Sequence, residues 1–117
     1  MDTEHKHQAA LFRWAEIQNK RTPELSLLFA IPNGGLRSKA TAAKLKAEGV
    51  KAGVPDICLP VAKGEYHGLF IELKAGRNKP TPTQVQWHAR LSYEGYRVTV
   101  CWGWKAAREA IEEYLLV

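Results

Sequence analysis

The strongest constraint on the fold is a set of three apolar segments of strand length, at residues 56–61, 69–74 and 97–102. The first two flank a short glycine-containing segment, which is typical of a β-hairpin. The third is rich in β-branched and aromatic side chains, which favour strands. Segments with helical spacing lie before, between and after these strands. This order predicts an α/β fold in which helices flank a mixed β-sheet.

Four helices are expected, at about 3–20, 39–48, 81–94 and 105–116. Each of the first three ends at a proline or glycine, as helices commonly do. A further apolar run at 27–31 precedes the turn Pro32-Asn33-Gly34-Gly35 and predicts another short strand. In the third helix, either Val85, His88 and Leu91 or Trp87 and Leu91 mark the buried side.

The length and composition indicate one globular domain spanning residues 1–117, because 45% of the residues are hydrophobic and only 25% are charged. Cys58 and Cys101 lie in apolar runs without close Cys or His partners, so reduced core thiols are expected rather than a zinc site. The chain has no apolar run of membrane-spanning length and no signal-peptide core, which predicts a cytoplasmic protein without a membrane partner.

Positive charge is in excess and is unevenly placed, with 17 Lys and Arg against 12 Asp and Glu. Two clusters hold much of it: Arg37, Lys39, Lys44, Lys46 and Lys51, and then Lys74, Arg77 and Lys79. A polyanion such as nucleic acid is a plausible partner for this distribution. A solvated basic surface with no such partner explains the charge alone equally well.

Two charges interrupt the apolar strand at 69–74. Because alternate side chains share one face of a strand, Glu72 and Lys74 point together, whereas Ile71 and Leu73 point toward the core. If the hairpin pairs its two strands, Asp56 lies close to Glu72. Two convergent carboxylates suit Mg²⁺ or Mn²⁺, and a nearby lysine suits phosphate. An exposed strand face with an incidental ion pair is the structural alternative.

These residues belong to a longer pattern. Its parts are Ile31-Pro32-Asn33-Gly34-Gly35, the segment from Gly49 to Asp56, the segment from Leu69 to Lys74, and Pro82-Thr83-Gln84. The spacing of Pro55-Asp56 and Glu72-Leu73-Lys74 matches the PD-(D/E)xK signature of restriction-endonuclease-like nucleases. Together, the segments closely resemble the viral-type replication-repair nuclease family, VRR-NUC. The resemblance extends over about residues 4–116 and implies a stand-alone, phage-like member with a restriction-endonuclease-like core.

The resemblance also implies roles for individual residues. Asp56, Glu72 and the main-chain carbonyl of Leu73 would bind the metal, and Lys74 would be the catalytic lysine. Gln84 would face the active site from the start of the following helix.

A glutamate on the first helix completes the acidic cluster in this family, and Glu16, at the edge of the apolar stripe, is the residue predicted to do so. An ordinary boundary glutamate is the alternative. The resemblance also implies that the turn containing Asn33 lies close to the site, although turn formation alone explains that residue equally well. The residues expected to contact DNA are Asn33, Arg37, Lys39, Lys46, Lys51, Arg77 and Lys79.

The resulting hypothesis is a Mg²⁺- or Mn²⁺-dependent DNA endonuclease in the cytoplasm of a bacterial or phage-infected cell. The resemblance implies a homodimer selective for branched DNA such as four-way (Holliday) junctions, with Tyr114 and Leu116 as candidate interface residues. A catalytically silent nucleic-acid-binding module and a duplex nicking or restriction-type endonuclease are the alternatives. His88 is interpreted as a core residue. Trp87, Trp102 and Trp104 are interpreted as core or interface aromatics, with base-stacking platforms as the alternative.

Overall fold

The computed structural model describes residues 3–32 and 38–116. Its elements, in chain order, are α1 (Glu4–Gln18), the 3₁₀ helix η1 (Pro23–Leu27), β1 (Phe29–Ala30), α2 (Lys39–Ala47), β2 (Ile57–Leu59), β3 (Leu69–Lys74), α3 (Pro82–Tyr93), β4 (Arg97–Trp102) and α4 (Trp104–Leu115). The predicted α/β fold with a mixed sheet flanked by helices is confirmed.

The four strands form one sheet in the order β1-β2-β3-β4. β2 runs antiparallel to both β1 and β3, whereas β4 runs parallel to β3. Residues 57–59 and 69–74 therefore pair as the predicted hairpin. The predicted strand at 27–31 is shorter than expected, because Leu27 ends the 3₁₀ helix that follows Pro23.

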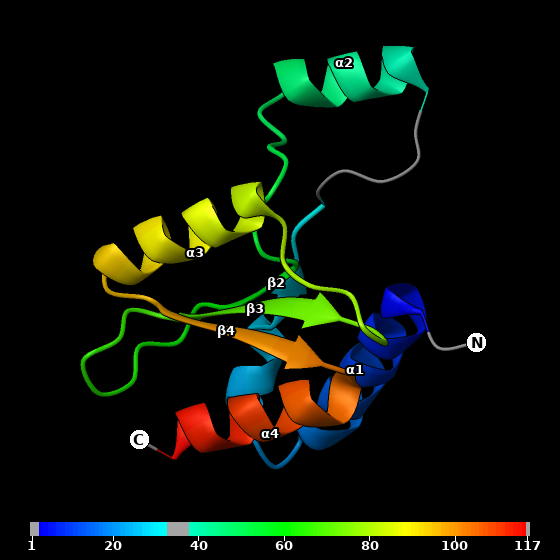
Figure 1. The fold of residues 1–117 in the computed structure, drawn as a ribbon. Helices are drawn as coiled ribbons and strands as arrows, with labels where there is room; N and C mark the ends of the chain where they lie inside the picture. Colours follow the sequence, from blue (N-terminus) through cyan, green and yellow to red (C-terminus); the bar gives the residue numbers. More distant parts are fainter. Residues whose placement is uncertain (1–2, 33–37, 117) are drawn as a thin grey trace.

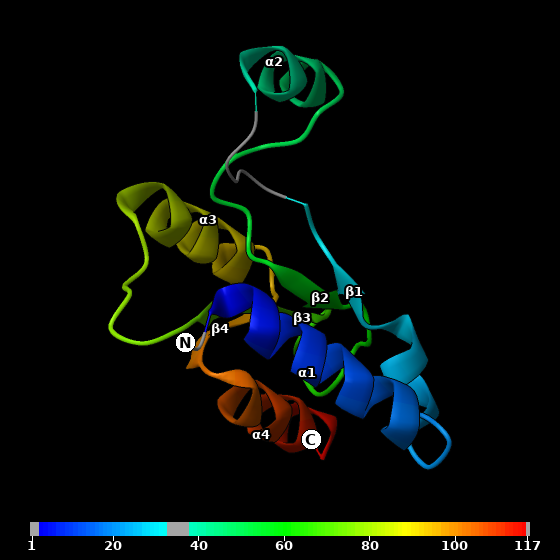
Figure 2. The same cartoon turned by 90° about the vertical axis from the view of Figure 1, so that its right-hand side faces the viewer.

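The sheet separates two layers of helix. Figures 1 and 2 show α1 and α4 on one face of the sheet and α3 on the other. The core lies between the sheet and the α1/α4 layer, where Leu11, Ile71, Leu73 and Ile111 are fully or almost fully buried. The α3 face is different, since none of the residues of α3, all of which the structure describes, is buried.

Helix α2 stands apart from the rest of the molecule in both views (Figures 1 and 2). Its N-terminus is capped by Ser38, whose side chain accepts a hydrogen bond from the backbone N–H of Thr41 at 3.1 Å. No residue of this fully described helix is buried, and only Leu45 is partly covered. Helix α2 therefore contributes almost nothing to the core.

Tyr114 is buried, and its hydroxyl donates a hydrogen bond to the carbonyl of Val61 at 2.5 Å. Its predicted role in a dimer interface is wrong, because the side chain is committed to the core. Leu116 is 87% exposed. Within residues 3–32 and 38–116, no helix combines the length and the apolar character that a membrane span requires.

Candidate active site

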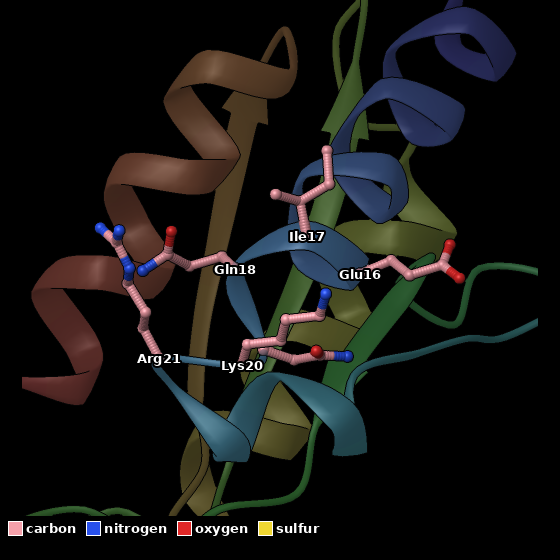
Figure 3. Close-up of a pocket in the computed structure, with 6 residues that line it drawn as sticks. Glu16, Ile17, Gln18, Lys20 and Arg21 are labelled. Carbon is pink, nitrogen blue, oxygen red and sulfur yellow. The ribbon is translucent and has the colours of Figure 1, made fainter.

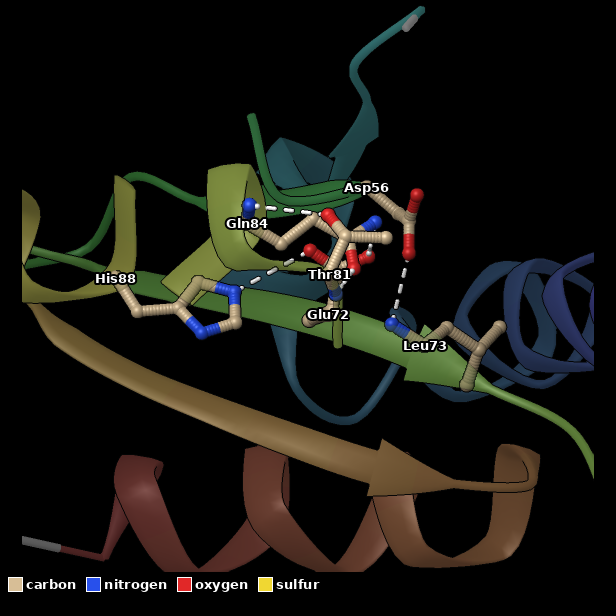
Figure 4. Close-up of polar contacts among 6 residues, drawn as sticks. All are labelled: Asp56, Glu72, Leu73, Thr81, Gln84 and His88. Atoms are coloured by element: carbon tan, nitrogen blue, oxygen red, sulfur yellow. Dashed lines mark hydrogen bonds and ion pairs between the residues drawn. The ribbon is translucent and has the colours of Figure 1, made fainter. Parts of the chain in front are cut away.

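The hairpin register brings Asp56 beside Glu72. Ile57, the first residue of β2, pairs with Ile71 in the antiparallel ladder, so Asp56, just before β2, adjoins Glu72 of β3. Asp56 Oδ2 accepts a hydrogen bond from the backbone N–H of Leu73 at 2.8 Å (Figure 4). In an extended strand, the N–H and C=O of one residue point to the same side. The Leu73 carbonyl is therefore directed toward the same edge as Asp56.

The Glu72 side chain is only 1% exposed and lies beneath α3. Gln84 Nε2 donates to Glu72 Oε2 at 3.3 Å, and His88 Nε2 lies 3.3 Å from Glu72 Oε1 (Figure 4). Because residues four apart share one face of a helix, Gln84 and His88 approach the carboxylate together. This burial against two polar side chains does not fit the structural alternative of an exposed strand face with an incidental ion pair.

A capping box fixes the orientation of Gln84. The backbone N–H of Thr81 donates to Gln84 Oε1 at 2.9 Å, and the backbone N–H of Gln84 donates to Thr81 Oγ1 at 3.2 Å. These bonds satisfy the start of α3 and occupy the amide oxygen. The amide nitrogen is thereby left to donate to Glu72. Gln84 thus helps to cap the N-terminus of the helix and also supports the carboxylate.

The electrostatics of Glu72 reflect its burial and its acidic neighbours. Burial, followed by the hydrogen bond with Asp56 and the charge of Asp56, raises the pKa of Glu72 to about 9. The charge of Lys74 opposes this rise, and the charge of Glu4 adds to it. Burial, followed by the charge of Lys74, lowers the pKa of His88, while Asp56 opposes that shift. His88 is therefore favoured as a neutral imidazole.

The donor set suits a small, hard divalent cation. Asp56, Glu72 and the Leu73 carbonyl offer oxygen ligands, and Mg²⁺ commonly binds through one or two carboxylates while keeping several waters. In the part of the chain that the structure describes, no group of three or more His, Cys, Asp or Glu side chains is arranged to hold a metal. The residues therefore fit a partly hydrated ion better than a closed, fully protein-ligated one.

Lys74 completes this face of β3. It lies two residues after Glu72, on the same face of the strand, and is 6% exposed. Its charge acts on the pKa of both Glu72 and His88, as expected for an ammonium group close to them. A cation held beside two carboxylates is suited to contacting a bound phosphate.

Glu16 does not join this group. It is exposed and lines a surface hollow at the C-terminal end of α1 with Ile17, Gln18, Asn19, Lys20 and Arg21 (Figure 3). The N-terminal end of α1 is the part that adjoins the ends of β3 and β4, since His7 Nδ1 accepts from the backbone N–H of Trp104 at 3.0 Å. At 1.5 Å per residue, Glu16 lies about 18 Å along the helix from Glu4. The prediction of Glu16 at the acidic cluster is therefore wrong.

Glu4 is the α1 carboxylate near the site. It raises the pKa of Glu72 through its charge, and its Oε2 accepts a hydrogen bond from Asn78 Nδ2 at 3.1 Å. This role of Glu4 was not predicted, because Glu4 precedes the apolar stripe from which the buried face of the helix was assigned. Its position in the first turn, after the N-cap Thr3, is typical of an acidic residue that favours helix initiation.

The predicted DNA-contacting residues lie in two separate regions. Lys39 and Lys46 are exposed on α2, and Lys51 is exposed after it, in the segment leading to β2. Arg77 and Lys79 are exposed in the loop between β3 and α3, next to Lys74 in sequence. Asn33 and Arg37 are outside the residues that the structure describes.

His88 is a second site residue, after Glu4, that was not predicted from the sequence. Its apolar neighbours on α3 suggested a core role, but it contacts Glu72. A usable signal was present, because His88 follows Gln84 by four positions and so shares its helix face. Val85, the other residue expected on the buried side, is 53% exposed.

The comparisons with known proteins agree with this geometry. A solved structure described as "VRR_NUC domain protein" superposes with a TM-score of 0.79 at 33% sequence identity, covering 97% of this chain and 88% of that one. "Putative nuclease p44" of Acyrthosiphon pisum secondary endosymbiont phage 1 is 42% identical over 50 residues, 43% of this chain. That match spans about half of the phage protein, 52% of its length.

The family model of the VRR-NUC domain matches residues 2–104, which include every element from α1 to β4. The matched region contains Asp56, Glu72 and Lys74 in the arrangement described above. The chain therefore belongs to the VRR-NUC family.

Proposed function

We propose that this protein is a metal-dependent endonuclease that hydrolyses phosphodiester bonds in DNA. One observation carries the proposal: Glu72 is buried beside Asp56 and next to Lys74, at the edge where β2 and β3 meet. A carboxylate buried next to another carboxylate is costly unless a cation or a proton compensates it. Membership of the VRR-NUC family and the likeness to a phage nuclease support this chemistry.

Asp56, Glu72 and the Leu73 carbonyl are the proposed ligands of Mg²⁺ or Mn²⁺. When bound, such an ion polarises the phosphate and lowers the pKa of a coordinated water. We assign the additional carboxylate near the site to Glu4 rather than Glu16, on the basis of its charge effect on Glu72.

The remaining side chains act on the reacting groups or on Glu72. Lys74 orients the attacking water and stabilises negative charge on the phosphate as it grows in the transition state. Gln84 donates to Glu72 Oε2 and limits the rotation of the carboxylate. His88 acts in the same way at Oε1 when a bound cation keeps Glu72 ionised despite its raised pKa, because a neutral imidazole that carries its proton on Nε2 then donates to that oxygen. Both therefore preorganise the ligand set.

The exposed basic residues would hold DNA through its phosphates. Lys39, Lys46 and Lys51 would act from α2 and the segment after it, and Arg77 and Lys79 from the loop beside the site. Phosphate contacts of this kind position a duplex without reading its sequence. They favour recognition of DNA shape over recognition of a base sequence. Asn33 and Arg37 remain proposed DNA contacts on the family resemblance.

One site cuts one strand at a time, so paired incisions in a four-way junction require two copies. We therefore propose a homodimer acting on branched DNA, with residues 1–117 forming one nuclease domain in the cytoplasm of a bacterial or phage-infected cell. Leu116 remains a candidate interface residue because it is 87% exposed.

The test is cleavage of end-labelled four-way junction, flap and linear duplex DNA with Mg²⁺, Mn²⁺ or EDTA, alongside sedimentation of the protein over a concentration series. The proposal predicts metal-dependent cutting, fastest on the branched substrates, by a dimer. Equal cutting of all three substrates would remove the branch selectivity. A monomer at every concentration would remove the dimer.

A further inference from the structure

Trp102 lies at the edge of the proposed active site. It is the last residue of β4 and pairs with Lys74, the last residue of β3, in the parallel ladder. The backbone N–H of Gly103 donates to the Lys74 carbonyl at 2.9 Å, so the pairing continues to the end of both strands. Paired residues of adjacent strands lie about 5 Å apart and point to the same face. Trp102 is therefore on the face that carries Glu72 and Lys74.

Trp102 contrasts with Lys74 in exposure. Trp102 is 49% exposed, whereas Lys74 is 6% exposed and Glu72 is 1% exposed. Exposing half of a large aromatic surface forgoes the free energy that its burial would supply. An exposed indole beside a buried catalytic lysine is thus suited to contact a ligand of that site.

The indole is held by its polar atom. Trp102 Nε1 donates to the carbonyl of Asn78 at 2.8 Å, and the Asn78 side chain donates to Glu4 at 3.1 Å. The backbone N–H of Asn78 also donates to the carbonyl of Ala75 at 3.2 Å, which closes the turn after β3. These contacts tie the ring orientation to the loop beside the acidic residues. A ring anchored through its edge is preorganised to offer a face.

The same loop carries positive charge. Arg77 and Lys79 flank Asn78 in sequence, and both are exposed. Grooves that bind single-stranded DNA combine basic side chains for the phosphates with aromatic rings on which bases stack. Trp102, Arg77 and Lys79 provide both components next to Lys74.

We propose that Trp102 stacks on a nucleobase of the DNA strand being cut, close to the scissile phosphate. This inference rests on the proposed nuclease function and deepens it. Within a continuous duplex both faces of each base are covered by its neighbours, so a free face occurs only where stacking is interrupted. Branch points, strand ends and unpaired bases provide such faces. Trp102 therefore selects DNA whose stacking is broken at the cleavage position.

The first experiment measures the affinity of fluorescein-labelled four-way junction in EDTA, where binding is separated from cutting. Trp102→Ala should weaken binding by about 5- to 150-fold, the range found when a base-stacking aromatic is removed. Trp102→Phe retains an aromatic face and should recover most of the loss. Tyr93→Ala is the matched control, because Tyr93 is an aromatic that is 84% exposed on α3 and outside the site. It should leave the affinity unchanged.

The second experiment identifies the contacted base. Junctions with a single abasic position, scanned along the strand that is cut, are bound by wild type and by Trp102→Ala. One abasic position should reproduce the loss in wild type and cause little further loss in Trp102→Ala, as expected for two halves of one contact. If the affinity losses caused by Trp102→Ala and by the abasic site add in full at every position, the proposal is overturned.

Two further outcomes are distinguishable. If Trp102→Ala converts a dimer to a monomer while every abasic position leaves wild-type binding intact, Trp102 belongs to a protein interface and the proposal is overturned. The other outcome is that wild type cuts no DNA with any metal while one abasic position still gives affinity losses that do not add to those of Trp102→Ala. In that case the nuclease function is overturned and the stacking contact is retained. Equal unfolding temperatures of the variants establish that each comparison is made between folded proteins.

Discussion

His88 Nε2 lies 3.3 Å from Glu72 Oε1, on the opposite carboxylate oxygen from the one that accepts from Gln84 Nε2. The Glu72 carboxylate is consequently held at both oxygens by side chains from one face of α3. Hydrogen bonds of this kind, from residues that do not bind the metal themselves, fix the orientation of a metal-binding carboxylate. His88 is therefore assigned a positioning role, acting through Glu72.

Removing His88 should weaken metal binding more than it affects the fold. His88→Ala is expected to raise the Mg²⁺ concentration for half-maximal cleavage by about 10- to 100-fold, the usual cost of losing such a partner. His88→Gln places an amide donor near the same position and should restore much of the affinity. Gln86→Ala, an exposed change on another side of α3, is the control. Calorimetric titration with Mn²⁺ gives a readout independent of turnover. Unchanged metal affinity in His88→Ala would contradict the assignment.

The buried carboxylate predicts a specific pH dependence of stability. The pKa of Glu72 is raised from 4.5 to about 9 in the folded protein. Between these values the unfolded chain has released the proton that the folded chain retains, so the free energy of unfolding falls as pH rises. Glu72→Gln lacks this contribution. In EDTA, the variant should resist urea better than wild type toward alkaline pH. With Mg²⁺, its cleavage should be more than about 100-fold slower than that of wild type.

Adding metal distinguishes the contribution of Glu72 to the free energy of unfolding from a stabilisation that the substitution causes in some other way. Mg²⁺ should stabilise wild type and have little effect on Glu72→Gln, because only a ligand that binds the folded state raises its stability. Urea denaturation from about pH 5 to pH 9, with EDTA or Mg²⁺, makes the comparison. Parallel pH curves for the two proteins would show that Glu72 does not titrate as described.

The basic residues of α2 should contribute to DNA affinity through charge alone. Lys39 and Lys46 are seven positions apart, about two helical turns, and so share one side of the helix. Replacing both with Ala should reduce the slope of log affinity against log salt by about 2, roughly one for each phosphate contact. Lys20→Ala, an exposed lysine near the C-terminal end of α1, is the control. An unchanged slope would exclude α2 from the DNA interface.

Gly53 fixes how the segment after α2 returns to the body of the protein. Its φ is +90°, and an added Cβ would lie 2.5 Å from Thr83 Cγ2 and 3.2 Å from the Thr83 backbone carbonyl carbon. Gly53→Ala should therefore lower the free energy of unfolding by about 2–4 kcal/mol, through overpacking and backbone strain. Gly49→Ala is the matched control, since its φ is +96° but nothing lies within 4 Å of the added atom. Urea denaturation should show a cost of only about 1 kcal/mol there.

The sequence predicted well what local periodicity determines. The strand at 97–102 has the predicted bounds, and the alternation in β3 correctly directs Ile71 and Leu73 into the core. The hairpin then brings Asp56 to Glu72, because antiparallel pairing around a short connection leaves little choice of partner. The central part of the candidate site was therefore accessible from sequence.

The incorrect predictions concern residues whose place depends on how elements distant in sequence pack against one another. Both Glu4 and Glu16 lie on α1, and only the docking of α1 against the strand ends reveals which of them is near Glu72. His88 looked like a core residue because periodicity does not reveal that its face of α3 meets a carboxylate. Tyr114 was proposed as a dimer-interface residue, but its hydroxyl donates to the Val61 carbonyl, which lies 53 residues away in sequence.

The most direct test of the account is single-turnover cleavage of labelled four-way junction by wild type and Asp56→Asn, with Mg²⁺ or EDTA. Asparagine preserves the size of the side chain and an oxygen that can accept from the Leu73 N–H, but it removes the charge that holds a cation. The account predicts cutting by wild type with Mg²⁺, none in EDTA, and a loss of more than about 100-fold in the variant. Equal cutting by both proteins, or cutting in EDTA, would contradict a metal-dependent site at Asp56 and Glu72.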